Sequence, residues 1–205
     1  MAVRAQEEFY GEPEITLAPM RRRHLRAVLR IEAQVYPRPW SLRLFMSELA
    51  LRSTRTYTVA LVDGVVAGYS GLMVQAEDAH VTTIAVDPRW HRQGIGSRLL
   101  LQMARAAVEQ DARHLTLEVR MSNEPAKKLY TAFGFAPAGV RRNYYVETNE
   151  DALVMWANDI GAAEYLARLT RIEAALPAPL VPKGAAVQDT GAPGPGGATP
   201  KRGQG

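Results

Sequence analysis

The segment HVTTIAVDPRWHRQGIGSRLLLQMARAAVEQ, residues 80–110, decides the fold. Its first part, His80 to Val86, is rich in β-branched residues and predicts a strand that stops at Asp87-Pro88. A short loop with two glycines, residues 91–96, follows and opens into an apolar-faced helix predicted over residues 97–110. A strand, a glycine loop and a helix in this order place unpaired amide groups at a helix N-terminus, where the helix dipole favours an anion. The segment therefore predicts a pyrophosphate site.

Two common phosphate-binding fingerprints can be compared with this loop. A dinucleotide fingerprint needs a third glycine where this chain has Leu99. A nucleoside-triphosphate loop needs Gly-Lys-Ser or Gly-Lys-Thr after a four-residue gap, which is absent. Because two glycines alone are weak evidence, a helix start without any ligand remains open as well.

The remaining sequence predicts an α/β fold with a mixed sheet. Further strands are expected over residues 14–17, 56–62, 65–74, 115–119, 139–146 and 151–157, and further helices over residues 21–35, 41–51, 123–134 and 161–176. Asp63-Gly64 predicts a tight hairpin between two of the strands. Ser41 and Asn123 are expected to cap the helices that they begin.

Composition limits the class of protein. The chain has 205 residues, no cysteine and a net charge of +4. Without cysteine, disulfides, thiolate metal sites and a cysteine nucleophile are excluded, and a reducing cytoplasm is the expected compartment. The four histidines have no metal-ligand spacing, and no segment is long enough to span a bilayer, so we expect neither a metal nor a membrane partner. The positive charge fits a polyanionic cofactor or a nucleic acid.

The chain divides into three parts. Residues 1–160 are expected to form one catalytic domain, and residues 161–176 a terminal helix. Residues 177–205 are rich in proline and glycine and contain no aromatic residue, so they cannot offset the entropy of ordering. We predict that this tail is disordered.

The run Ile84-Ala85-Val86-Asp87-Pro88 followed by Arg92-Gln93-Gly94-Ile95-Gly96 resembles the central signature of the GNAT superfamily of N-acyltransferases. The resemblance implies a mixed, mostly antiparallel sheet flanked by helices, with acetyl-coenzyme A as the cosubstrate. It also implies which residues contact that cosubstrate: Ile84, Ala85 and Val86 by pairing with pantetheine, and Arg92, Gln93, Gly94, Ile95, Gly96 and Ser97 around the pyrophosphate. His91 departs from the family pattern, which usually has Gln or Arg there, but backbone amides do most of the binding.

A second signature lies thirty residues further on. The residues Leu117-Glu118-Val119-Arg120, Ser122-Asn123 and Leu129-Tyr130, together with Pro39-Trp40-Ser41 and Arg141 to Tyr145, resemble the RimI-type enzymes of this superfamily. These enzymes acetylate the N-terminal alanine of the eighteenth small-subunit ribosomal protein. The resemblance covers residues 14–158 and implies a ribosomal-protein N-terminus as substrate, with no direct nucleic-acid partner. It leaves the oligomeric state open.

The resemblance also implies roles for individual side chains. Glu118 matches the general base, which acts through water, and Tyr130 matches the general acid near the sulfur. Asn123 matches a cofactor contact, and Tyr144 and Tyr145 line the peptide slot. Each has a plain alternative: a solvent-facing strand carboxylate, a core aromatic, a helix cap and ordinary strand aromatics, respectively.

Proton transfer from tyrosine is energetically demanding. A tyrosine with a pKa of about 10, donating to a thiolate whose conjugate acid is near 8.5, faces about 2 kcal/mol uphill. Tyr130 is therefore expected to hydrogen-bond the sulfur more than it surrenders its proton.

Two other functions compete with this one. The first is a GNAT enzyme for another amine, such as an antibiotic, a polyamine or a protein lysine. The second is a non-catalytic module that senses acetyl-coenzyme A or docks on RNA through the arginines of residues 21–30. Both candidate catalytic residues argue against the second, and the arginines are expected to form a solvated helix face.

Overall fold

A single mixed sheet organises the chain. The computed structural model describes residues 14–176 and 181–182, and orders the strands of its eight-stranded sheet β6-β7-β5-β4-β3-β2-β1-β8. The strands are β1 (Ile15–Pro19), β2 (Arg55–Val62), β3 (Val65–Gln75), β4 (Asp78–Val86), β5 (His114–Arg120), β6 (Ala136–Tyr145), β7 (Glu150–Ala157) and β8 (Val181–Pro182). Neighbours are antiparallel except β4 with β5 and β1 with β8. The expected mixed, mostly antiparallel sheet is confirmed.

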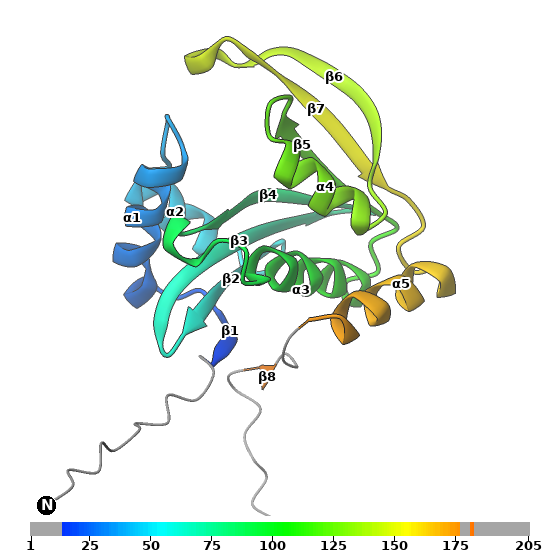
Figure 1. Ribbon diagram of the computed structural model, residues 1–205, viewed down its shortest axis with the longest axis horizontal. Coiled ribbons are helices and arrows are strands. Elements are labelled where there is room, and N and C mark those ends of the chain that lie inside the picture. The colour runs from blue at the N-terminus through cyan, green and yellow to red at the C-terminus, as the bar shows by residue number, and fades with distance from the viewer. Residues whose placement is uncertain (1–13, 177–180, 183–205) are drawn as a thin grey trace, which may run out of the picture.

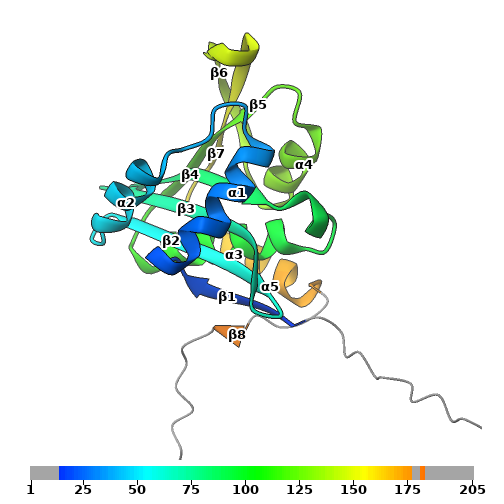
Figure 2. The ribbon, with the colours of Figure 1, turned by 90° about the vertical axis from the view of Figure 1, so that its left-hand side faces the viewer.

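Helices cover both faces of this sheet (Figures 1 and 2). They are α1 (Leu25–Val35), α2 (Leu42–Ala50), α3 (Ile95–Glu109), α4 (Glu124–Ala132) and α5 (Ala163–Ala174). α1 and α2 pack on one face through a cluster that includes Ile31, Phe45 and Tyr69. α3, α4 and α5 pack on the other face around Leu100 and Leu115.

Local signals predicted several element boundaries. Asp63 and Gly64 have φ angles of 47° and 79°, so the β2–β3 hairpin closes through the left-handed turn that an Asp-Gly pair favours. The Ser41 side chain accepts a hydrogen bond from the Leu44 N–H at 3.2 Å and caps α2. α3 begins two residues before the predicted start, because Gly94 adopts the left-handed conformation and acts as its N-cap.

β4 and β5 form a fork. They pair only where Asp78–His80 lies beside His114–Thr116, and their later halves have no mutual pairing. β4 also changes register against β3 where Gly71 pairs with Thr83 and Leu72 with Val81, so Thr82 is a bulge residue. A bulge bends its strand. The later part of β4 therefore presents an edge without a strand partner on the side of β5.

The C-terminal segment differs in part from its prediction. The helix expected over residues 161–176 is α5, which an Arg105–Glu173 ion pair joins to α3. Within the segment predicted to be disordered, residues 181–182 pair with β1 in parallel, which is a departure at these two positions. The rest of that prediction lies outside the described residues. No helix in the described part of the chain is both long and apolar enough to cross a membrane.

Candidate active site

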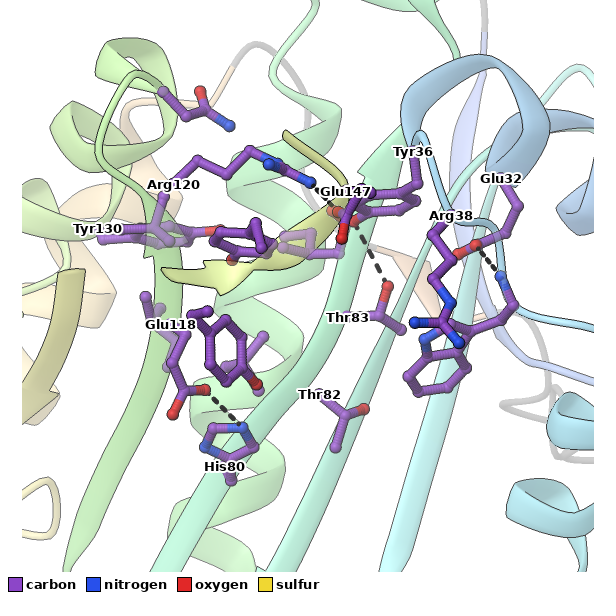
Figure 3. A pocket seen from close by; sticks show the side chains of 18 residues that line it. Glu32, Tyr36, Arg38, His80, Thr82, Thr83, Glu118, Arg120, Tyr130 and Glu147 are labelled. Atoms are coloured by element: carbon purple, nitrogen blue, oxygen red, sulfur yellow. Dashed lines mark hydrogen bonds and ion pairs between the residues drawn. The ribbon is translucent and has the colours of Figure 1, made fainter. Parts of the chain in front are cut away.

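A cavity of about 360 Å³ opens where β4 and β5 separate (Figure 3). Side chains from α1, the α1–α2 connection, β4, β5, α4 with its cap, and the end of the β6–β7 hairpin line it. They are Glu32, Tyr36, Arg38, Trp40, His80, Val81, Thr82, Thr83, Ile84, Leu117, Glu118, Val119, Arg120, Asn123, Tyr130, Tyr144, Tyr145 and Glu147. Five of the predicted site residues outside the cofactor strand and loop therefore share one cavity, together with Ile84.

The start of α3 is suited to bind an anion. Gly94 is its N-cap, has a φ of 74° and has no side chain to satisfy the first amides of the helix. The first intrahelical bond that involves this cap runs from the Arg98 N–H to the Gly94 carbonyl at 3.0 Å, so the helix offers no acceptor to the amides of residues 95–97. Arg92, in the same loop, has a φ of 65° and adds a positive charge. These features fit a pyrophosphate, as the sequence predicts.

The unpaired edge of β4 carries two side-chain hydrogen bonds. The Tyr36 hydroxyl donates to the Ile84 carbonyl at 2.9 Å, and His91 Nε2 lies 3.0 Å from the Val86 carbonyl, to which it can only donate. All three residues of this stretch have partners on β3, but the Ala85 side chain lies in the core under α1, whereas those of Ile84 and Val86 pack against the cluster that contains Leu99 of α3. The polar edge that faces the fork is thus formed by residues 84 and 86.

Glu118 lies on the cavity side of β5. Its neighbours Leu117 and Val119 point into the core, so strand alternation turns the Glu118 carboxylate to the other face. One oxygen is 3.2 Å from His80 Nε2, and the other is 3.1 Å from the Arg141 guanidinium. The side chain is only 9% exposed, so the alternative of a solvent-facing carboxylate is wrong. The hydrogen bond with His80 and the charge of Arg141 lower the pKa of Glu118 in spite of its burial.

Tyr130 joins the core to the cavity. Its side chain is 6% exposed, and its ring centroid lies 5.8 Å from that of Phe135. Burial raises the pKa of Tyr130 far above its usual value. The hydroxyl therefore keeps its proton and can act as a hydrogen-bond donor, while the ring also serves as a core aromatic.

Arg120 holds the end of the β6–β7 hairpin over the cavity. Its guanidinium lies 2.6 Å from Glu147 and 3.1 Å from Glu150, and its carbon is 3.8 Å from the centroid of the Tyr145 ring. Tyr144 packs edge-on against Tyr145, with 5.1 Å between the ring centroids. Burial raises the pKa of Tyr145 to about 12, although the Arg120 charge opposes it. The two tyrosines therefore form one wall that Arg120 fixes.

Glu32 was not predicted from the sequence as a site residue. It is buried on α1, where the Tyr69 hydroxyl and the Trp40 N–H donate to its carboxyl, the latter at 2.7 Å. Burial raises the pKa of Glu32, and these two hydrogen bonds oppose the rise. The carboxyl fixes the connection between α1 and α2, which brings Tyr36 and Arg38 to the cavity. The one sequence signal for a role of Glu32 is that an acidic residue stands next to the core position Ile31.

The remaining predicted residues behave as follows. Asn123 caps α4 by accepting the Ala126 N–H at 3.2 Å and also lines the cavity, so both of its predicted positions are compatible. The arginines at residues 21, 22, 23, 26 and 30 are exposed, as expected of a solvated face. Among the residues that the structure describes, no group of three or more potential ligands could hold a metal ion.

Comparison with known proteins agrees with this geometry. The model of the acetyltransferase (GNAT) family matches residues 25–135. A Bacillus subtilis protein with the provisional name [ribosomal protein bS18]-alanine N-acetyltransferase is 42% identical over 137 residues, which are 67% of this chain and 91% of that protein. The [ribosomal protein bS18]-alanine N-acetyltransferase of Escherichia coli K12 is 34% identical over 142 residues, 68% of this chain and 95% of that enzyme.

The fold agrees as well. The crystal structure of the ribosomal-protein-S18-alanine N-acetyltransferase from Escherichia coli matches with a TM-score of 0.65 and 32% identity, over 71% of this chain and 94% of that one. The residues matched by the family model include β4, the glycine loop, α3, β5 and α4, which are the elements that form the fork and the helix start suited to an anion. By sequence and by fold, the chain belongs to the GNAT family of acetyltransferases.

Proposed function

We propose that this protein transfers the acetyl group of acetyl-coenzyme A to the N-terminal α-amine of a protein, with the N-terminal alanine of ribosomal protein bS18 as its substrate. The observation that carries the proposal is the cavity at the β4–β5 fork, which combines a carboxylate with a wall of two tyrosines. The names of the E. coli and B. subtilis relatives support the choice of acceptor.

The cosubstrate fits the other end of the fork. We propose that the amides at the start of α3 and the Arg92 side chain bind its pyrophosphate, and that the edge of β4 at residues 84–86 pairs with pantetheine. Asn123 lies in the cavity near this path. When bound there, acetyl-coenzyme A supplies the thioester carbonyl to the same cavity that holds Glu118.

The acceptor must lose a proton before it can attack. We propose Glu118 as the base, acting through water, and Tyr130 as a donor of a hydrogen bond to the sulfur. At pH 7 an α-amine with a pKa near 8 costs about 1.4 kcal/mol to deprotonate, whereas a lysine near 10.4 costs about 4.6 kcal/mol. Because the pKa of Glu118 is lowered, this carboxylate is a weak base and suits the α-amine better than lysine.

The acceptor peptide enters between two rims. Tyr144 and Tyr145 form one, and the α1–α2 connection with Tyr36 and Arg38 forms the other. Aromatic side chains with polar tips suit an extended peptide, because they offer apolar area and hydrogen bonds together. This arrangement favours a chain terminus that inserts its first residue into the fork.

A mass-spectrometric panel tests the proposal. Peptides with a free or a blocked N-terminus, each with and without an internal lysine, are incubated with acetyl-coenzyme A and the protein. We expect acetylation of the free α-amine alone, fastest for the bS18 sequence. Acetylation at lysine in blocked peptides, or reaction of small amines only, would replace this function by that of another GNAT amine acetyltransferase. No turnover of acetyl-coenzyme A with any amine would indicate a binding module.

A further inference from the structure

The fold brings a histidine to the mouth of the fork. His80 and Thr116 are the last pair of the short parallel ladder between β4 and β5. Glu118 lies two residues beyond Thr116, and therefore on the same face of β5. Figure 3 shows the His80 ring and the Glu118 carboxylate pointing toward each other across the gap between the strands.

Both nitrogens of His80 have a partner. Nε2 lies 3.2 Å from the Glu118 carboxylate, and Nδ1 lies 2.8 Å from the Thr116 hydroxyl. A hydroxyl can turn to donate or to accept, so Thr116 can hold the ring in its neutral and in its protonated form. Arg141 occupies the other oxygen of Glu118.

We propose that His80 and Glu118 act as one proton-accepting pair, in which His80 shares the proton that the acceptor amine releases; this rests on the proposed function. An N–H bond of the acceptor ammonium breaks, its electron pair stays on nitrogen, and the pair gains one proton. The charge of the pair thereby changes from one negative charge to zero. The histidine is part of the cavity wall, so no movement of the chain is needed.

Proton affinity favours the pair over the carboxylate alone. With reference values of about 8 for an α-amine and about 4.3 for glutamate, transfer to a lone carboxylate is unfavourable by about 5,000-fold. In the folded site the hydrogen bond with His80 and the charge of Arg141 lower the pKa of Glu118, so the carboxylate by itself takes the proton less readily still. An imidazole is in general a better proton acceptor than a carboxylate, so sharing the proton with one makes the transfer less unfavourable. Interacting groups titrate together, so the proton belongs to the pair.

Other charges face the same cavity and contribute to its titration. Arg141 of β6 contacts Glu118, and its guanidinium carbon lies 5.6 Å from the centroid of the Tyr144 ring. The remaining charged or titratable groups of the wall are Glu32, Tyr36, Arg38, Arg120, Tyr130, Tyr145 and Glu147. Among the described residues, His80 is the only histidine that lines this cavity.

The test is the pH dependence of the acetylation rate. In the wild type, log kcat/KM should bend twice as pH rises from about 5 to about 9, once for the pair and once for the amine. In His80→Gln, which keeps a hydrogen bond to Glu118 but cannot take up a proton, kcat should fall about 100-fold and the lower bend should disappear. KM for the peptide should change less than threefold if the amide fills the space of the ring.

Three further variants separate a shared proton from a structural role. The double variant Glu118→Gln/His80→Gln should have a kcat little lower than that of the less active single variant, because the two residues act as a unit. His80→Ala should regain rate when imidazole is added. The control is His114→Gln on β5, whose ring faces Trp156 at 5.7 Å rather than the cavity and which should keep both bends.

Definite results overturn the pair. The proposal is wrong if the lower bend of log kcat/KM against pH is unchanged in His80→Gln. It is also wrong if the rate losses of the two single variants multiply in the double variant. Should His80→Gln fail to fold by circular dichroism, Thr116→Val replaces it and should shift the lower bend. The proposed function is judged separately, by which nitrogen the wild type acetylates, because the bends can be measured with whichever amine reacts.

Discussion

Replacing Arg120 by methionine should weaken peptide binding without removing catalysis. Methionine keeps much of the apolar stem and deletes the guanidinium that contacts Glu147, Glu150 and the Tyr145 ring. These contacts join β5 to the hairpin end that carries the tyrosine wall. Without them, the wall should occupy its ordered position for a smaller fraction of the time.

The magnitude follows from the exposure of the partners. Arg120, Glu147 and Glu150 are 18%, 28% and 21% exposed, so each ion pair contributes about 0.5 kcal/mol. The contact with the Tyr145 ring adds about 1 kcal/mol. The total of about 2 kcal/mol corresponds to about 30-fold in the equilibrium between ordered and displaced walls. Where only the ordered wall binds, KM for the peptide rises by up to this factor.

The assay measures KM and kcat for a bS18 peptide, together with the affinity for acetyl-coenzyme A by calorimetry. KM should rise about 10- to 30-fold, while kcat and cofactor affinity stay within about threefold. Arg105→Met is the matched control. It removes a bidentate ion pair with Glu173 of α5, and neither residue lines the cavity. An unchanged KM in Arg120→Met, or an equal rise in both variants, refutes the reasoning.

Three other substitutions test the site and the fold. Gly94→Val places a β-branched residue at a φ of 74° and should lower acetyl-coenzyme A affinity at least 10-fold by calorimetry, whereas Gly161→Val, where an added Cβ meets nothing within 4 Å, should not. Tyr130→Phe should lower kcat about 10-fold, the value of one hydrogen bond; a loss above about 1,000-fold would instead identify a proton donor. Asp87→Asn should cost about 1 kcal/mol of unfolding free energy at pH 7, because hydrogen bonds from Arg89 lower the pKa of Asp87 in the fold. A depressed folded value means that this stabilisation exists above about pH 4 and is lost as pH falls through the lower, folded value, so melting curves of the two proteins should converge in acid.

Much of the fold was predictable because short-range signals decide it. The structure confirms the Asp63-Gly64 turn, the Ser41 cap and the position of the glycine loop at the start of α3, all of which depend on a few neighbouring residues. The start of α3 was set two residues too late, because a glycine cap leaves no side-chain signal at the helix start. The pairing of residues 181–182 with β1 is a long-range contact that composition cannot reveal.

The site was predictable only where a motif spans it. Glu118, Tyr130 and the glycine loop lie within two continuous signatures, so the resemblance to the family predicts them. His80 and Glu32 lie outside the quoted motifs, and Arg141 begins one of them but has no predicted role there. The three meet Glu118 or the cavity only because of strand register and helix packing. The spacing of these residues along the chain does not predict such long-range contacts. The depressed pKa of Glu118 likewise depends on partners that local sequence does not name.

The short ladder between β4 and β5 makes the sheet behave as two plates joined along a seam. Only Asp78–His80 and His114–Thr116 form that seam, and the six residues of β4 beyond it extend about 20 Å. A rotation of about 5° between the plates moves the far ends of the strands by about 2 Å, a distance that decides whether reacting atoms touch. Leu100 and Met103 of α3 share one core cluster with Ala79 and Leu115 of the seam, so we expect their packing to influence the width of the opening. Substitutions there should alter turnover although neither side chain lines the cavity.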